Sequence, residues 1–293
     1  MRKLSFFIVL FFLYSPSTAQ KSIIDSCHCK SRVPLTSVFL GSGSLLMLQQ
    51  AWYSQYPQSR FHLFNDNDEW LQMDKVGHAF TNYQISANVF RAYMNTGYDR
   101  TKANRYAMIT SLGYMTGIEI LDGFSSQWGF SSGDFIANVF GSGLFYFQEK
   151  FWQEQKIQLK FSYQNSPYAK FNSAQLGDNF QQRLLKDYNG QRYWLSFNTN
   201  VFYRNDNAFA KIFAISLGYG VDQMVYAKTN ISLVNNFQPQ RKFLFSFDAD
   251  LKQVKWKRSW MKKLAGYLSI IKIPMPTLEV RGNGKIKFHP IYF

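Results

Sequence analysis

The hydrophobic pattern of the chain changes its period once, near Ile157. Before this point apolar residues recur at helical spacing, and after it they alternate with polar residues in short runs rich in aromatic and β-branched side chains. A period near 3.6 is typical of helices, and a period of two is typical of strands. We therefore expect an α+β protein, with a helical N-terminal part followed by an antiparallel sheet.

Four helices are expected in the N-terminal part. The first lies within the 27 residues 33–59, which contain no Asp, Glu, Lys or Arg and are long enough to span a bilayer. The other three are expected at about 74–95, 102–121 and 132–152, and their charge-free stretches are shorter than a membrane span. The pattern therefore predicts a membrane-associated four-helix bundle, either partly sunk in a membrane or buried in protein.

The C-terminal part is expected to form strands at five places. These segments are separated by Asn, Asp, Gly and Pro turns and span residues 158–163, 193–203, 209–219, 242–251 and 277–288. Between the last two, residues 259–271 have helical spacing, with Trp260, Leu264 and Leu268 on one face and several Lys and Arg nearby. This composition is typical of a basic amphipathic helix that lies in a membrane interface.

The first residues carry the pattern of an export signal. Arg2 and Lys3 precede an apolar stretch, and Ala19 ends the small-residue spacing that a signal peptidase needs, so cleavage is expected before Gln20. Because Gln20 is not a cysteine, this pattern does not predict a lipid anchor. We therefore expect an exported protein of the cell envelope, in the outer membrane or periplasm, with a signal peptide at 1–19, a helical bundle at 20–155 and a β-rich region at 156–293.

Only two cysteines occur, Cys27 and Cys29. In an oxidising exported compartment they could pair with each other or with a partner. A metal clip with His28 is the less favoured interpretation, because it lacks a fourth ligand and the ordinary spacing of zinc sites.

The charge of the chain is concentrated in its second half. The formal net charge is +15, and 21 basic residues stand against 7 acidic ones after residue 155. These Lys and Arg are interleaved with aromatic residues, which favours a surface that faces anionic lipid or lipopolysaccharide. Nucleic acid is not expected as a partner, because export separates the protein from it. Another envelope protein remains an alternative partner.

Ionisable and amide side chains lie inside the apolar helices. Asp74, His78 and Asn82 follow one another at i, i+4 and i+8, and Asp134 and Asn138 repeat the i, i+4 spacing. Burying a carboxylate is costly unless it is paired, so mutual contacts within this set are expected. The candidate catalytic residues are Asp74, His78, Glu119 and Asp134. The candidate substrate-binding residues are Lys75, Asn82, Asp122, Trp128 and Asn138.

Three interpretations of this set remain open: a polar network that fixes helix register, a catalytic or binding site, and a metal site. The last is the least favoured, because only one histidine is well placed and catalytic zinc usually has more. No metal or other cofactor is therefore predicted.

The motifs around these residues resemble a known family. They lie at residues 65–70, 73–78, 119–125, 128–138, 186–191 and 193–196. Together they resemble the YfiM-like family of predicted periplasmic lipoproteins, over about residues 50 to 290. The order Asp-Lys-x-x-His, then Glu, then Asp-x-x-x-Asn also resembles the membrane-embedded VanZ-like family. Neither resemblance implies an established reaction.

Two functions are therefore predicted as alternatives. The first is a non-enzymatic envelope protein that associates with the outer membrane and binds lipid or another envelope component. The second is a membrane-embedded enzyme acting on a lipid-linked or cell-wall substrate. In the second, His78 transfers a proton, Asp74 or Glu119 orients it, and Asp134 with Asn138 holds the substrate.

Overall fold

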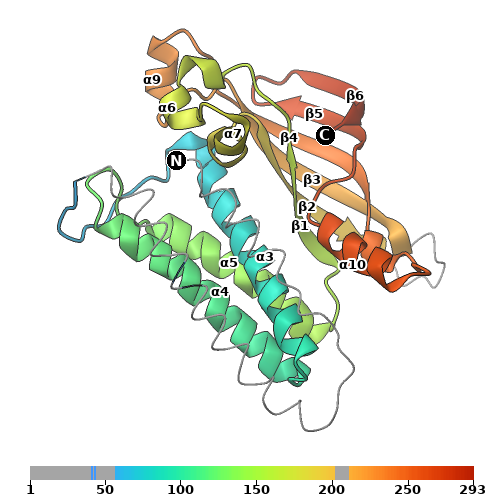
Figure 1. Ribbon diagram of the computed structural model, residues 1–293. Helices are drawn as coiled ribbons and strands as arrows, with labels where there is room; N and C mark the ends of the chain where they lie inside the picture. The colour runs from blue at the N-terminus through green and yellow to red at the C-terminus, as the bar shows by residue number, and fades with distance from the viewer. Residues whose placement is uncertain (1–40, 42, 44–56, 202–210) are drawn as a thin grey trace. The chain divides into compact units, whose positions relative to one another are not determined.

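The computed structural model describes residues 41, 43, 57–201 and 211–293 (Figure 1). The predicted signal peptide, Cys27, Cys29 and almost all of the first predicted helix lie outside these residues. The described chain divides into two compact units: a helical unit that includes residues 81–153, and a sheet unit made of residues 67–80 and 154–293.

The described part of the helical unit contains three long helices. They are α3 (Met73–Asn95), whose first eight residues belong to the sheet unit, α4 (Arg100–Gly123) and α5 (Ser132–Phe151). Asp99 caps α4 by accepting a hydrogen bond from the backbone N–H of Lys102, and Ser131 caps α5 in the same way. These three predicted helices are confirmed to within two residues at every end.

The core of this unit combines aromatic packing with hydrogen bonds between helices. Tyr83 and Phe90 of α3 both meet Phe145 of α5 edge to face. Ser86 and Ser111 share a buried hydrogen bond of 2.7 Å. None of the helices in the described part of the chain is both long and apolar enough to cross a membrane.

The prediction of one four-helix bundle followed by a sheet with a single helix is too simple. The described residues hold seven α-helices, and four of them lie between strands: α6 (Ser173–Leu176), α7 (Phe180–Lys186), α9 (Thr229–Val234) and α10 (Ser259–Leu268). Three of these are one or two turns long, which is too short for a hydrophobic period to be recognised. The fourth, α10, is the amphipathic helix that the sequence predicts.

In the described part of the chain, the sheet has six antiparallel strands, each paired with the next along the chain. They are β1 (Ile157–Tyr163), β2 (Gln191–Asn198), β3 (Phe213–Asp222), β4 (Gln240–Ala249), β5 (Met275–Arg281) and β6 (Ile286–Tyr292). The segment predicted as one strand over 277–288 is a hairpin instead. Gly284 adopts a left-handed conformation, with φ +79°, which lets the chain reverse there.

The sheet has one apolar and one polar face, and the apolar face is the more exposed of the two. Pairing aligns one row across all six strands on what we call the apolar face: Leu159, Leu195, Leu217, Phe245, Leu278 and Phe288. The adjacent row lies on the polar face: Gln158, Ser196, Ser216, Ser246, Thr277 and His289. A sheet with one solvated face normally buries its apolar side.

Burial confirms this inversion. The polar face is almost fully buried, and it includes Lys160 and Glu279. The start of α3 packs Val76 and Phe80 against the β1–β3 end of the apolar face, around Tyr193. Beyond this cover, the apolar face is exposed from β3 to β6.

Candidate functional site

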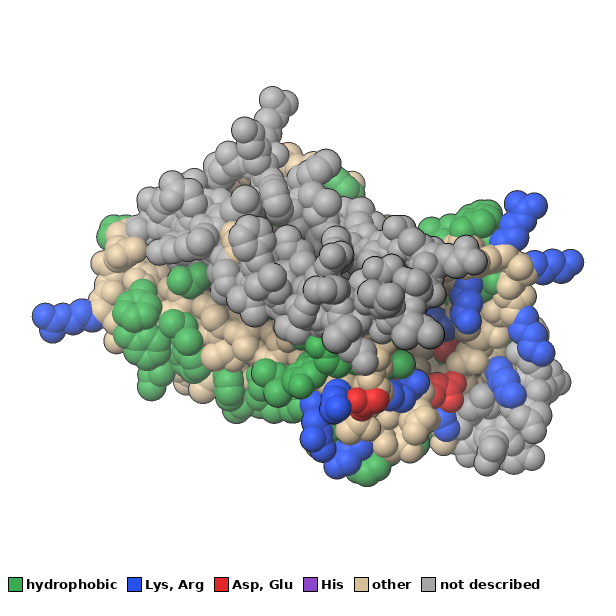
Figure 2. Space-filling view, turned by 60° about the horizontal axis from the view of Figure 1, so that its bottom comes forward, with side chains coloured by type: hydrophobic (Ala, Val, Ile, Leu, Met, Phe, Trp, Pro, Cys, Tyr) green, Lys and Arg blue, Asp and Glu red, His purple; other side chains and the backbone are tan. Residues whose placement is uncertain are grey.

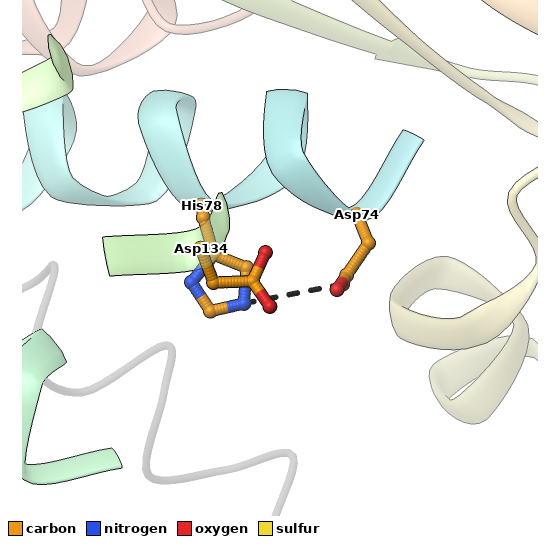
Figure 3. A group of neighbouring side chains, drawn as sticks. All are labelled: Asp74, His78 and Asp134. Atoms are coloured by element: carbon orange, nitrogen blue, oxygen red, sulfur yellow. Dashed lines mark ion pairs between the residues drawn. The ribbon is translucent and has the colours of Figure 1, made fainter. Parts of the chain in front are cut away.

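Asp74 is the centre of a polar set at the start of α3. Its Oδ1 accepts a 2.7 Å hydrogen bond from the Tyr188 hydroxyl, and His78 Nε2 lies 3.9 Å from the same oxygen (Figure 3). Lys75 Nζ lies 3.8 Å from Oδ2. The carboxylate is 31% exposed, whereas the His78 side chain is 17% exposed. Asp74 also lies in the first turn of α3, where the helix dipole stabilises a negative charge.

A strained turn positions this set. Trp70, Leu71 and Gln72 form the 3₁₀ turn η2 immediately before α3, and all three have positive φ, between 49° and 64°. A non-glycine residue in this region costs roughly 1–2 kcal/mol. Strain of this kind persists only where the surroundings hold it, and it is frequent at functional sites.

Several contacts hold the turn in place. The Trp70 N–H donates to the Ala227 carbonyl, and the Trp70 ring packs on Tyr188 at 5.1 Å between centroids. The Tyr219 hydroxyl donates to the Leu71 carbonyl. The same Tyr188 therefore contacts both the strained turn and the Asp74 carboxylate.

The Tyr193 side chain lies next to α3, at Gly77. A Cβ at Gly77 would stand 3.0 Å from the Tyr193 hydroxyl oxygen, so glycine allows α3 to approach the sheet closely. The hydroxyl donates to Gln191 Oε1. Burial and the nearby charge of Asp74 raise the pKa of Tyr193, so its phenol stays neutral across the physiological range.

This arrangement is suited to proton transfer. An imidazole beside a carboxylate can accept and return a proton near neutral pH. A carboxylate oxygen and an imidazole nitrogen are also donor atoms for divalent metals. A catalytic zinc takes three protein ligands, so Asp74 and His78 by themselves do not define a metal site.

The remaining candidate residues belong to the helical unit. Asn82, Glu119, Asp134 and Asn138 are all buried, and the Asn82 side-chain amide donates to the Asn138 carbonyl at 2.6 Å. Ser131 donates to Asp66 and accepts from the Asp134 N–H. These contacts tie α3 to α5 and fix the entry into α5.

Asp122 and Trp128 are only partly buried. Asp122 lies in the last turn of α4, where its carbonyl accepts from the N–H groups of Phe124 and Ser125. Trp128 lies in the connection between α4 and α5. The structure therefore groups Asp74 with Lys75 and His78 in the sheet unit and places the other six candidates in the helical unit.

The polar face of the sheet contains a buried charge cluster that the sequence analysis did not identify. Lys160 Nζ lies 2.8 Å from Asp248 Oδ2, which also accepts hydrogen bonds from Ser196 and Ser216. Lys272 donates to the Phe247 carbonyl and lies over the Trp194 ring. Burial lowers the pKa of Lys272 from its ordinary value of 10.5 to about 8; Asp248 opposes this shift, and Lys160 adds to it.

A second buried cluster lies near the β6 edge of the same face. Glu279 is 2% exposed and accepts from His289 Nε2 at 3.0 Å and from Arg281 Nε at 2.6 Å. Asp222 pairs with Lys242 at 3.2 Å. Burial raises the pKa of Glu279, but the hydrogen bond from Arg281 and the charges of Lys242 and Arg281 outweigh burial and hold this pKa below its usual value.

Sequence reasoning also missed Tyr188 as a site residue, although it lies in one of the motifs behind the family resemblance. Its role depends on a contact between positions 114 residues apart, for which a periodic pattern gives no indication. The left-handed turn could not be recognised either, because residues 70–72 contain no glycine or asparagine.

The fold and its buried sites define an α+β protein that joins a helical unit to a sheet with an inverted burial pattern. Residues 62–150 match the model of a family described as predicted periplasmic lipoproteins, DUF2279. This description confirms the predicted export to the cell envelope. The match covers α3, α4 and α5 and stops before the sheet, so it is shorter than the resemblance expected over residues 50 to 290. A comparison with curated proteins and with solved structures finds no match.

Proposed function

We propose that this chain is a non-enzymatic protein of the cell envelope that associates with the outer membrane, and that the apolar face of its sheet contacts lipid acyl chains. One observation carries the proposal. The row Leu217, Phe245, Leu278 and Phe288 is between 38% and 63% exposed, while the opposite face of the same strands is buried and polar.

The size of this apolar surface supports the proposal. Other large side chains of β3 to β6 extend the row, and those exposed are Phe243, Phe247, Ile286 and Ile291. Contiguous apolar patches on soluble monomers are usually small, and larger ones mark sites that contact a protein or a membrane. Each large apolar side chain moved from water into lipid contributes about 1.5–3 kcal/mol.

The charge around this surface favours lipid as the partner. Arg241 lies on the apolar face at one end of β4, and five exposed Lys and Arg residues lie in and before α10, which follows the other end of β4. Lys and Arg near an anionic leaflet each add about 1 kcal/mol to membrane binding. An apolar surface edged with basic side chains therefore complements a bilayer that carries negative headgroups.

The test is flotation of the mature chain with vesicles of phosphatidylethanolamine and phosphatidylglycerol. The double variant Phe245→Gln, Phe288→Gln is expected to lose most of the membrane-bound fraction. The control is Ile109→Gln, Ile136→Gln, which changes two apolar residues of α4 and α5 that are more exposed than Phe245 and Phe288. Equal binding by the wild type and the sheet variant, with thermal melts unchanged, would contradict the proposal.

A second function, an enzyme acting on a lipid-linked or cell-wall substrate, is favoured by the Asp74 set. The specific observation is the hydrogen bond from Tyr188 to the carboxylate that faces His78, next to a strained turn. In this function His78 transfers the proton and Asp74 orients it. The roles assigned to Glu119, Asp134 and Asn138, and the resemblance to the VanZ-like family, stay predictions.

His78→Gln distinguishes the two functions. Glutamine keeps much of the size and hydrogen bonding of histidine but cannot shuttle a proton. An enzyme is expected to lose its envelope phenotype while the melting temperature stays the same. If phenotype and melting temperature fall together, the set is structural and the enzymatic function is wrong.

A further inference from the structure

The helix α10 turns its apolar side outward. Trp260, Leu264 and Leu268 follow one another at i, i+4 and i+8, and they are between 43% and 57% exposed. Ile271, just beyond the helix, continues the stripe at 41% exposed. The small residue Ala265 is the buried one, at 3%. A helix that packs on a core normally buries its large apolar side chains, so this stripe is available to a partner.

Positive charge surrounds the stripe. Five basic side chains in and before α10 are exposed: Lys255, Lys257, Arg258, Lys262 and Lys263. The sequence contains no Asp or Glu between residues 251 and 278. Figure 2 shows Lys and Arg side chains outnumbering Asp and Glu on one face of the molecule. A partner that covers this stripe must therefore be apolar and carry negative charge.

The position of α10 in the sheet unit suits an interface. The helix belongs to the connection between Ala249, the last residue of β4, and Met275, the first residue of β5 (Figure 1). The helix therefore lies in the connection at the end of the sheet where β4 ends and β5 begins. If the apolar face of the sheet contacts acyl chains, a basic helix at one end of the strands lies within reach of the phosphate headgroups.

We propose that α10 and the basic segment before it form a binding site for the phosphate headgroups of anionic lipids in a bilayer. The stripe of Trp260, Leu264 and Leu268 inserts between lipids, and the exposed lysines pair with the phosphates. This inference rests on the proposed function, because it assumes that the sheet unit meets a bilayer. It adds that binding is selective for anionic lipid and that the selectivity belongs to α10.

The experiment measures partition of the full mature chain into two kinds of vesicle, phosphatidylcholine alone and phosphatidylcholine with phosphatidylglycerol, at low and high salt. The wild type is expected to bind the anionic vesicles more tightly, and salt is expected to reduce that difference because it screens exposed charges. The variant Lys262→Gln, Lys263→Gln should lose about 30-fold in partition to the anionic vesicles, since each lysine contributes about 1 kcal/mol there and 1.4 kcal/mol is tenfold. Its partition to phosphatidylcholine should not change.

Two controls separate this site from general charge and from the sheet. Lys285→Gln, Lys287→Gln removes the same charge from another exposed place and is expected to have a smaller effect. Phe245→Gln, Phe288→Gln is expected to weaken binding to both kinds of vesicle alike. All of these side chains are exposed, so thermal melts should confirm that the variants fold.

The failures are distinguishable. If the wild type binds neither vesicle, the proposed function and this inference both fall. If it binds both vesicles equally, or if the Lys262, Lys263 variant loses no more than the Lys285, Lys287 variant, only the inference is overturned.

Discussion

At the scale of single residues, the side chains that organise this protein are polar groups paired over long distances in the sequence. Asp74 accepts a hydrogen bond from a tyrosine 114 positions later, and Asp248 collects hydrogen bonds from β2 and β3 and a lysine from β1. A buried charge is tolerated only with such partners, and removing one partner leaves the other uncompensated. Each of these groups therefore has a measurable effect on stability.

Tyr188→Phe removes one hydrogen bond and keeps the ring. We expect the free energy of unfolding to fall by about 1 kcal/mol, because the bond is to a charged group that is partly exposed. Urea denaturation measures this loss. In a double-mutant cycle with Asp74→Ala, which removes the acceptor, the loss should largely disappear; a full loss in the Asp74→Ala background would show that the phenol acts through another contact.

Because the pKa of Lys272 is lowered in the folded chain, we expect the free energy of unfolding to rise with pH. Its pKa is about 8 in the folded chain, against about 10.4 in the unfolded chain, so between these values the unfolded state binds more protons. The free energy of unfolding should therefore increase with pH, by about 2 kcal/mol between about pH 7.5 and 9.5. Lys272→Met removes this group and should flatten the profile. An unchanged slope in the variant would assign the dependence to other groups.

At the scale of elements, the sheet shows that alternation and burial are separate properties. Along β4, Phe243, Phe245 and Phe247 alternate with Leu244, Ser246 and Asp248, as in any strand with two unlike faces. The phenylalanines are exposed and the other three are buried. The period of the strand is that of any β-strand. Which of its two faces is buried depends on the segments that pack against each face.

The β5–β6 hairpin depends on the conformation of one glycine. Gly284 has φ +79° and no atom within 4 Å of a built Cβ, so alanine there meets backbone strain without any clash. Gly284→Ala should lower the free energy of unfolding by about 1–2 kcal/mol. Gly282→Ala is the matched control, because its Cβ would meet the nearest backbone atom at 3.6 Å, an ordinary contact, at a φ outside the left-handed range. Equal losses in both variants would contradict the argument.

At the scale of the whole molecule, the positive charge is interpreted in the light of export to the cell envelope. The formal charge of the chain after residue 155 is +14, and in the proposed function this part of the exported protein faces an anionic envelope surface. The matched family, described as periplasmic, agrees with this destination.

Export also predicts a defined N-terminus. The spacing that ends at Ala19 should direct cleavage before Gln20. N-terminal sequencing of the protein purified from the cell envelope is expected to begin at Gln20. Recovery of Met1 in that fraction would show that the apolar stretch stays as an anchor.

The sequence by itself determined the elements whose signals are local. The periods of α3, α4, α5 and α10 were readable because each helix repeats its pattern over at least ten residues. The strands were readable as alternation, and the i, i+4 spacing of Asp74 and His78 placed them on one face of a helix. The short helices and the hairpin at Gly284 were missed because a few residues carry no period.

Only the tertiary structure decided which face of each strand is buried. An alternating pattern predicts that the two faces of a strand differ. Which face is covered depends on residues elsewhere in the chain, such as Lys272, which donates a hydrogen bond to the Phe247 carbonyl. It also decided that Tyr188 completes the Asp74 set and that three non-glycine residues before α3 are left-handed. Both depend on long-range contacts that hold a costly arrangement in place, and such contacts have no period in the sequence.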